Sequence, residues 1–150
     1  RAGRQARMTR EEIVAEARSW IGTPWVHQGR IKGLSVDCVG LIGGVALAVG
    51  IQGARDWSAN LQFYNYGRQP DPLLLNDGCA LWLDRIAVRD ATTADVLVMR
   101  FRRDPQHFAL LSATDYMIHA FAGAGKVVEN RLDEKWRRRI VSAWRFRGID

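Results

Sequence analysis

The feature that most constrains the fold is an unbroken run of apolar residues and glycines, Cys38–Val49. Asp37 precedes the run and Gly50 follows it, and these residue types favour the start and the end of a helix. A helix that is apolar on every side has to be buried, and this one is shorter than the roughly 20 residues that cross a bilayer. The sequence therefore predicts a buried central helix. We expect its glycines to let it lie very close to a sheet: Gly40, Gly43 and Gly44.

Two further helices are predicted in the first two thirds of the chain. Thr9-Arg-Glu-Glu12 matches a capping box, which predicts a first helix from this cap to about Trp20. Gly22-Thr-Pro24 then ends it. Another helix is predicted to start from a cap at Asn76 and to run to about Ile86.

The remainder of the chain is predicted to form strands. Its segments are short, rich in β-prone residues and separated by turn residues. They are Asp95–Phe101, His107–Ala113, Tyr116–Phe121, Lys126–Asn130 and Ile140–Phe146. Helices followed by an antiparallel meander predict an α+β fold. We expect the buried helix to pack on a central antiparallel sheet of about five or six strands.

The length of 150 residues fits one domain. We expect a flexible N-terminal extension over residues 1–8 and a single domain over residues 9–150. Two cysteines, Cys38 and Cys79, are too few to indicate a disulfide framework, and we interpret Cys79 as structural. No signal peptide pattern opens the sequence, which predicts synthesis in the cytoplasm, and no segment is predicted to insert in a membrane.

The formal net charge of +6 belongs to the two ends of the chain. Residues 1–10 hold four arginines and no acid, and residues 126–150 hold eight basic and four acidic residues. Such ends suit an anionic partner, such as a wall polymer, an acidic protein face or nucleic acid. A solvated surface is the simpler interpretation, and nucleic acid is the partner that we expect least.

Cys38 is the candidate nucleophile, because it occupies the first position of the predicted buried helix. The free N–H groups and the macrodipole of a helix N-terminus favour the thiolate form of a cysteine. A thiol nucleophile also needs a base, and the base needs a group that orients it. The candidates are the histidines of the chain, His27, His107 and His119.

His107 and His119 stand on neighbouring predicted strands, on either side of a turn near Ala113. A short hairpin centred on Ala113 would place the two side chains directly opposite each other, on one face of the sheet. One imidazole could then hydrogen-bond the other and set its tautomer. The sequence therefore predicts a relay in which His107 is the base of Cys38 and His119 orients it. A slip of one residue would turn one histidine to the other face.

Several short motifs carry a resemblance to a known family. They are Trp20-Ile-Gly-Thr-Pro-Trp25, His27-Gln28, Gly29, Asp37-Cys-Val-Gly-Leu41, Ala94-Asp-Val-Leu-Val98, His107-Phe-Ala-Leu-Leu111 and Met117-Ile-His-Ala120. Together they resemble the NlpC/P60 cysteine peptidases, and most of all the cell wall peptidases of phages and gene transfer agents. The resemblance extends over roughly residues 9–146 and is weakest over residues 51–90.

The resemblance implies a papain-like fold and a peptidoglycan hydrolase that needs no metal and no cofactor. Members of the family cleave stem peptides, typically between γ-D-glutamate and diaminopimelate or lysine. Carried onto this sequence, Cys38 is the nucleophile, His107 the general base and His119 the orienting residue. The backbone N–H of Cys38 would help to bind the oxyanion.

The resemblance also points to residues that would contact substrate. Asp37 contacts the free amine of the substrate in some members, although here it could act as a helix cap alone. Trp25 stands where many members have a tyrosine, and Val39 where many have a serine, so both bear on substrate preference. Trp25 could equally be part of the core. His27 is either a contact of a substrate loop or a histidine that bonds a loop carbonyl.

The phage branch implies a location and partners. The protein would be associated with a virion or tail structure, bind phage-like tail proteins and act on the wall in the periplasm of the recipient. The basic C-terminal segment is a candidate docking site for a tail protein.

Other functions use the same residues. An amidase or acyltransferase would share the covalent step. A zinc module could use cysteine, histidine and aspartate as ligands, but the short paired spacing of such modules is missing. An inert domain that binds wall, tail or nucleic acid would use the basic ends, where Arg137-Arg-Arg139 follows Trp136.

Overall fold

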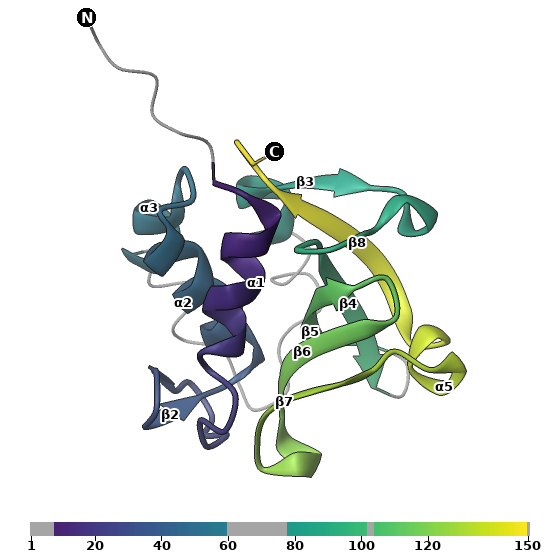
Figure 1. Ribbon diagram of the computed structural model, residues 1–150, viewed down its shortest axis with the longest axis horizontal. Coiled ribbons are helices and arrows are strands. Elements are labelled where there is room, and N and C mark those ends of the chain that lie inside the picture. The colour runs from purple at the N-terminus through teal and green to yellow at the C-terminus, as the bar shows by residue number, and fades with distance from the viewer. Residues whose placement is uncertain (1–7, 60–77, 102–103, 150) are drawn as a thin grey trace, which may run out of the picture.

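The computed structural model describes residues 8–59, 78–101 and 104–149. The predicted extension, apart from Met8, and the predicted cap at Asn76 lie outside these residues. In Figure 1 the helices of the first third of the chain gather on one side of a strongly curved sheet. Met8 forms a parallel bridge with Ile149, so the two ends of the described chain lie side by side.

Helix α1 (Arg10–Arg18) starts at the predicted capping box. The Thr9 hydroxyl accepts a hydrogen bond from the backbone N–H of Glu12 at 3.2 Å, and the Glu12 carboxylate accepts one from the backbone N–H of Thr9 at 2.9 Å. The helix ends two residues before the predicted Trp20. Its buried side is formed by Ile13, Val14 and Ala17.

Helix α2 (Cys38–Val49) has the predicted bounds. Its cap Asp37 has an extended backbone, and Gly50 ends the helix in the left-handed region at φ 75°. The prediction that α2 is buried on every side is wrong for its last turns, because Leu47 is 45% exposed. Helix α3 (Ala54–Ala59) follows directly and packs against α2.

The glycines of α2 make room for a loop and for a tryptophan, and the prediction that they face a sheet is wrong. A Cβ on Gly40 would collide with the backbone carbonyl of Gly29, and one on Gly44 would lie 2.5 Å from the ring of Trp20. A Cβ on Gly43 would meet nothing within 4 Å. The first turn of α2 can therefore touch the loop that precedes it.

Within the described residues, six strands form one antiparallel sheet in the order β3-β8-β4-β5-β6-β7. The strands are β3 (Leu83–Ile86), β4 (Val96–Phe101), β5 (Asp104–Ala113), β6 (Tyr116–Phe121), β7 (Lys126–Arg131) and β8 (Ile140–Phe146). Strands β4 to β7 form the predicted meander. Strand β8 leaves this order, because it returns to the other side of β4 and pairs there.

Strand β3 corrects the prediction of a helix up to Ile86. Residues 78–82 are helical, but the chain then turns into the sheet, where Leu83 pairs with Phe146 and Ile86 with Ala143.

The smaller described elements are β1 (Arg30–Ile31) and β2 (Ser35–Val36), which pair as a separate hairpin, the 3-10 helices η2 (Val88–Asp90) and η3 (Ala122–Ala124), and helix α5 (Glu134–Arg137).

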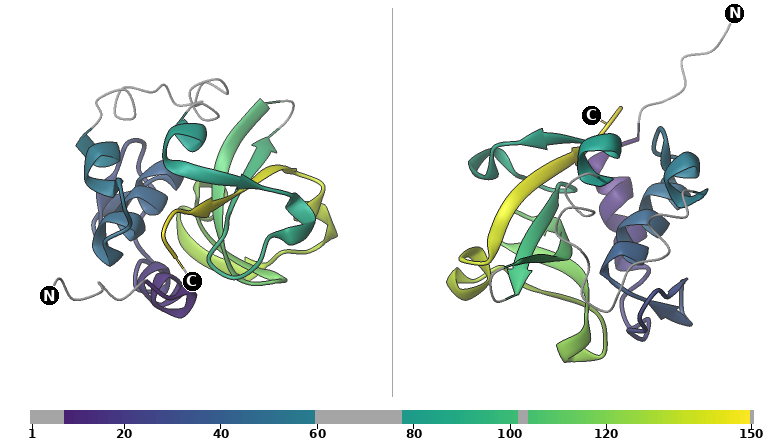
Figure 2. Two further views of the ribbon diagram at one scale, coloured as in Figure 1. Left: turned by 90° about the horizontal axis from the view of Figure 1, so that it is seen from above. Right: turned by 180° about the vertical axis from the view of Figure 1, so that it is seen from behind.

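In the part of the chain that the structure describes, apolar side chains form one cluster on each face of the sheet. Leu110 and Ile118 belong to the main cluster, which includes the buried sides of α1 and α2. Leu111 and Met117, their neighbours along the strands, belong to the second cluster, against which Trp136 of α5 packs. Figure 2 shows α5 on the side of the sheet that faces away from α1 and α2. None of the described helices is long and apolar enough to cross a membrane.

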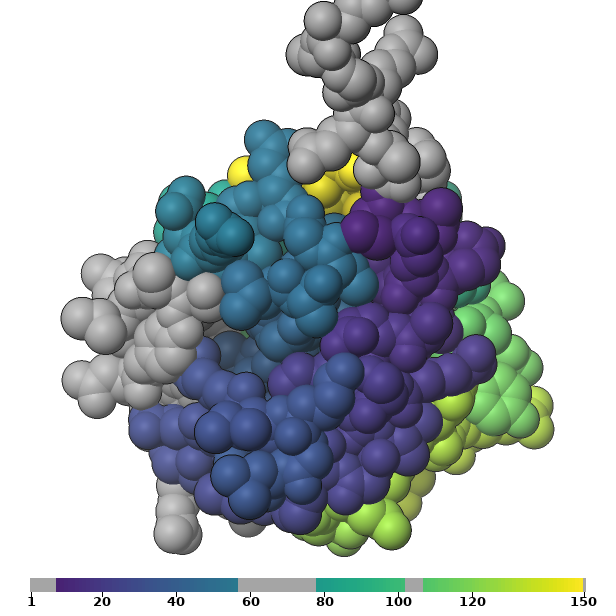
Figure 3. Space-filling model, turned by 60° about the vertical axis from the view of Figure 1, so that its left-hand side comes forward, coloured from purple at the N-terminus to yellow at the C-terminus, as the bar shows by residue number. Residues whose placement is uncertain are grey.

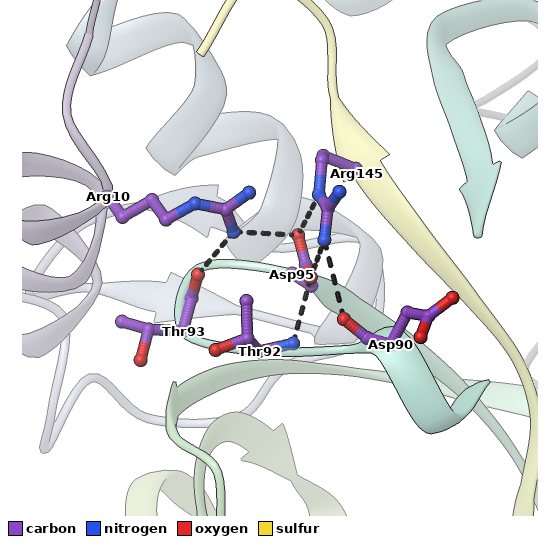
Figure 4. A network of polar contacts seen from close by, with 6 residues as sticks. All are labelled: Arg10, Asp90, Thr92, Thr93, Asp95 and Arg145. Carbon is purple, nitrogen blue, oxygen red and sulfur yellow. Dashed lines mark hydrogen bonds and ion pairs between the residues drawn. The ribbon is translucent and has the colours of Figure 1, made fainter. Parts of the chain in front are cut away.

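A buried carboxylate ties α1 to the sheet (Figure 4). Asp95 is fully buried at the start of β4. It accepts hydrogen bonds from the guanidinium of Arg10 at 3.1 Å, from that of Arg145 on β8 at 2.9 and 2.8 Å, and from the backbone N–H of Thr92 at 2.9 Å. Paired and fully hydrogen-bonded, the charge can stay in the interior.

Replacing Asp95 by asparagine should destabilise the fold. Removing one partner from a buried ion pair costs about 3–5 kcal/mol when the other charge is left buried. Because the side chains of Arg10 and Arg145 are 21% and 32% exposed, we expect about 2 kcal/mol in the free energy of unfolding, measured with urea.

The matched control is Asp84→Asn, which removes an exposed ion pair with Arg147. It should cost less than about 1 kcal/mol. Equal losses in the two variants would contradict the structural role of Asp95.

Candidate active site

Cys38 lies at the buried N-terminus of α2, and Asp37 fixes both this end and the loop before it. One oxygen of the Asp37 carboxylate accepts a hydrogen bond from the backbone N–H of Gly40 at 2.8 Å. The other accepts one from the backbone N–H of Gln28, also at 2.8 Å. Gln28 has a positive φ of 61°, which is uncommon for a residue other than glycine. The cap predicted for Asp37 is thus present, and the same carboxylate also holds the turn at Gln28.

The thiol of Cys38 lies against the start of β5. Cys38 is 8% exposed and belongs to the main apolar cluster. Burial, and after it the charge of Asp37, raise the pKa of the thiol to about 12, although backbone hydrogen bonds at Phe108 and Val39 lower it. Burial therefore opposes the thiolate form that a helix N-terminus favours.

The structure joins His107 and His119 as predicted. Nε2 of His107 and Nδ1 of His119 are 2.7 Å apart, and the two residues are 3% and 0% exposed. His107 immediately precedes Phe108, the residue at which the backbone interacts with the thiol. His107 is therefore one residue along β5 from the contact with Cys38. Its ring lies against Phe101 and Trp136, and Trp136 packs on the second apolar cluster, whereas Cys38 belongs to the main one.

The two histidines are not directly opposite each other, which corrects the predicted hairpin. The turn lies between Ala113 and Tyr116, and the register then shifts by one residue, so that Leu111 pairs with Met117 and Leu110 with Ile118. Continued along the strands, this register sets His119 opposite Ala109. His107 is therefore diagonal to His119, and long side chains can still reach each other across such a diagonal.

The shift in register is a β-bulge at Ser112, and it puts both histidines on one face. Without it, pairing outward from Ala113 and Tyr116 would set His119 opposite Leu110. His107 would then project from the other face of the sheet, because side chains alternate along a strand. One extra residue in β5 thus restores the alignment that the contact between the histidines needs.

Aromatic rings enclose the histidine pair. The ring of His119 stacks on Phe121 at 5.3 Å between centroids and meets the edge of Trp136 at 5.1 Å. His107 lies 5.1 Å from Phe101. The guanidinium of Arg139 lies over Phe101 and Trp136, at 5.3 and 5.4 Å. The pair therefore sits in a largely apolar enclosure with a cation at its border.

This enclosure disfavours the charged form of both histidines. Burial, followed by the charges of His119 and Arg139, lowers the pKa of His107 well below its ordinary value. Burial also lowers the pKa of His119. A neutral imidazole can accept a proton, so His107 has the protonation state that a base needs.

Asn130 on β7 is part of the same chain of hydrogen bonds, and sequence reasoning did not single it out. Its Oδ1 lies 2.6 Å from Nε2 of His119. Asn130 pairs with Met117, so it stands diagonal to His119, as His107 does on the other side. The available signal was a polar residue at the end of a predicted strand next to the histidine strand, which is weak evidence by itself.

The other predicted site residues lie in different environments. Val39 is 5% exposed, and its side chain lies in the main apolar cluster. Trp25 packs against the same cluster while its backbone N–H donates to the carbonyl of Gly125 at 2.8 Å. His27 is half-buried, next to the turn held by Asp37. Figure 3 shows the face formed by α1, α2 and the segment around β1 and β2. Contacts of Trp25, His27, Val39 and Asp37 with a substrate stay predictions.

Within residues 8–59, 78–101 and 104–149, no group of three or more histidine, cysteine, aspartate or glutamate side chains could hold a metal ion. Cys38 and Cys79 are not joined by a disulfide. Cys79 is buried in the main apolar cluster, in line with the structural interpretation.

Comparisons with known proteins identify the fold. No protein-family model matches the chain, and no curated protein matches it. Solved structures do match. A lipoprotein-like protein of the NLP/P60 family from Staphylococcus aureus is 20% identical with a TM-score of 0.64, over 94% of this chain and 41% of that one. The architecture is therefore that of the NlpC/P60 fold, a papain-like α+β arrangement.

Two other structures with this fold are peptidoglycan hydrolases. The NlpC/P60 domain of the peptidoglycan hydrolase SagA is 23% identical with a TM-score of 0.59, over 91% of this chain and 98% of that domain. The peptidoglycan hydrolase RipB from Mycobacterium tuberculosis is 19% identical with a TM-score of 0.57, over 91% of this chain and 63% of that protein. The chain thus spans nearly all of the SagA domain, but about two fifths of the S. aureus protein.

The charge of Asp37 should be measurable in the reactivity of Cys38. Alkylation by iodoacetamide follows the thiolate fraction, so the rate at Cys38 should keep rising above pH 9.0, the ordinary pKa of the thiol, towards the value of about 12. Because Asp37 raises this pKa, Asp37→Asn should move the profile to lower pH. Peptide mapping separates Cys38 from Cys79.

The control is Asp115→Asn, which removes a charge from an exposed turn. It should leave the profile unchanged, and circular dichroism would confirm that both variants are folded. A profile that stays in place, or moves to higher pH, in Asp37→Asn would contradict the assigned effect of its charge.

Proposed function

We propose that the protein is a cysteine peptidase that hydrolyses peptidoglycan stem peptides. The observation that carries this proposal is the buried, hydrogen-bonded pair of His107 and His119. His107 precedes Phe108, the residue of β5 whose backbone interacts with the thiol of Cys38, in an NlpC/P60 fold. SagA and RipB, which share the fold, support a wall substrate. The bond that we propose is the one between γ-D-glutamate and diaminopimelate or lysine, on the resemblance of the sequence motifs.

In the proposed mechanism Cys38 is the nucleophile and His107 its base. Nε2 of His107 faces His119, so Nδ1 is the nitrogen that would take the thiol proton. As Sγ bonds to the carbonyl carbon, the backbone N–H of Cys38 would stabilise the oxyanion. The C–N bond then breaks, His107 returns its proton to the leaving amine, and a thioester remains on Cys38.

Water completes the reaction. His107 takes a proton from the water that attacks the thioester, and it gives this proton to Sγ as the C–S bond breaks. The raised pKa of Cys38 and the lowered pKa of His107 favour a neutral resting pair. The proton would therefore move during the attack on the substrate and not before it.

We further propose that the protein is a tail-associated component of a phage-like particle that acts on the wall in the periplasm. The support is the resemblance of the motifs around Cys38 and His107 to that branch of the family. The basic residues of α5 and its surroundings are the proposed contact with a tail protein. Lys135, Arg137 and Arg138 are exposed there.

A wall-binding module without hydrolytic activity is the second candidate. One observation favours it, namely a thiol whose pKa is raised to about 12 by burial. Such a module would bind sacculi without releasing fragments, whereas the proposed enzyme releases peptides with new amino termini.

Cys38→Ala should abolish the release of fragments from purified peptidoglycan while the fold is kept. The nucleophile has no substitute, and loss of a covalent nucleophile removes several orders of magnitude in rate. Mass spectrometry of the digest identifies the bond at the same time. Cys79→Ala, a buried thiol placed outside the proposed mechanism, is the matched control and should retain activity. Wild-type digestion by Cys38→Ala would disprove the nucleophile, and no digestion by the wild type would favour the binding module.

A further inference from the structure

We propose that Asn130 is a positioning residue that sets the tautomers of both histidines and thereby leaves Nδ1 of His107 free of a proton. The consequence for catalysis rests on the proposed function, but the tautomers can be measured without any substrate. Asn130 would act through His119 and not by contact with the substrate.

The first step is the orientation of the Asn130 amide. Nδ2 donates a hydrogen bond to the backbone carbonyl of Arg131 at 3.0 Å. A carbonyl oxygen cannot donate, so the amide nitrogen has to face Arg131, and the amide oxygen faces His119. Oδ1 then lies 2.6 Å from Nε2 of His119. The backbone of β7 thus removes the ambiguity between the two ends of the amide.

The second step follows from what each atom can donate. An amide oxygen only accepts, so Nε2 of His119 carries a proton. A neutral imidazole has one N–H, so Nδ1 of His119 is an acceptor. The nitrogen 2.7 Å away is Nε2 of His107, which has to be the donor. The single N–H of neutral His107 is thereby placed on Nε2, and Nδ1 keeps its lone pair.

The third step concerns what would happen without the amide oxygen. His119 is fully buried among Phe121 and Trp136, so its Nε2–H would lose a partner that the enclosure does not replace. The alternative tautomer, with the proton on Nδ1 of His119, would make Nε2 of His107 an acceptor. The proton of His107 would move to Nδ1, and the base would be blocked. A wrong tautomer of this kind is a severe defect in hydrolases with a histidine base.

Other observations agree with this role for Asn130. The hydrogen bond from His119 to Asn130 raises the pKa of His119, against the effect of burial, which is the direction expected when the amide oxygen accepts from the ring. Asn130 is also neutral, so it orients the ring without adding a charge that would hold a second proton on it.

The test compares Asn130→Leu, which is similar in size but has no acceptor, with Asn130→Gln, which keeps the amide. Arg131→Gln is the matched control, because it changes an exposed side chain on the next residue and keeps the backbone carbonyl that orients the amide. Thermal unfolding would establish that each variant is folded.

The first readout is the state of the rings in protein labelled with ¹⁵N-histidine. In the wild type, the two-bond ¹⁵N–¹H pattern should show protonated Nε2 and unprotonated Nδ1 in His107 and His119. Asn130→Leu should change this pattern in both rings, and Asn130→Gln and Arg131→Gln should keep it. Wild-type tautomers in Asn130→Leu would overturn the proposal.

The second readout is hydrolysis of peptidoglycan peptides. Asn130→Leu should lower kcat on the order of tenfold to a hundredfold, by analogy with the removal of a partner that orients a metal-bound histidine, with KM little changed. Asn130→Gln should retain most of the wild-type kcat. A loss in Asn130→Gln as large as that in Asn130→Leu, or a change confined to KM, would overturn the positioning role.

The two readouts separate this inference from the proposed function. Tautomers that depend on Asn130 in a protein that digests no peptidoglycan would support the inference and contradict the proposed function. Digestion by the wild type together with unchanged tautomers in Asn130→Leu would support the proposed function and contradict the inference.

Discussion

The carboxylate of Asp37 is the interaction on which the arrangement of the site depends. Its two oxygens hold the first turn of α2 and the turn at Gln28, so the helix start and the preceding loop keep one relative position. The close approach of α2 to the loop needs glycine at position 40, because a Cβ there would meet the carbonyl of Gly29. Gly29 itself packs on the segment before α2, where a Cβ would lie 2.6 Å from the backbone nitrogen of Val36. Cys38 is placed against β5 as a result. The same charge also raises the pKa of the thiol.

Burial is the largest influence on the pKa values of the thiol and of the two imidazoles. Desolvation disfavours every charged form, so it raises the pKa of Cys38 and lowers the pKa of His107 and His119. A neutral thiol beside neutral imidazoles needs a base that acts as the new bond forms. Catalysis then requires that this base is aligned for proton transfer, and it does not require a preformed thiolate. The bulge at Ser112 and the amide of Asn130 both serve this alignment.

The parts of the fold that depend on local sequence could be predicted. The caps Thr9, Asp37 and Gly50 and the strands of the meander were expected from short-range patterns, and the structure confirms them. The position of β8 beside β4 could not be predicted, because pairing between distant segments leaves no mark in the local pattern. Residues Leu83–Ile86 were assigned to a helix for the same reason, since partners on β8 make them a strand.

The sequence predicts which residues form the candidate site better than it predicts how they are arranged. Two histidines on neighbouring strands were expected to meet, and they do, but the register depends on one extra residue at Ser112, which strand propensity does not indicate. The raised pKa of Cys38 depends on how deeply the helix start is buried, which is a property of the packed structure. The contact of Asn130 with His119 depends on the pairing of β6 with β7, which the local sequence does not indicate.

The central claim is that Cys38 forms a covalent acyl intermediate with a wall peptide. The most direct measurement is mass spectrometry of protein quenched in acid during turnover on peptidoglycan fragments. The account predicts a peptide that contains Cys38 with the acyl part of the substrate attached as a thioester, which disappears as the substrate is exhausted. Digestion that proceeds without this adduct, or with the adduct on Cys79, would contradict it.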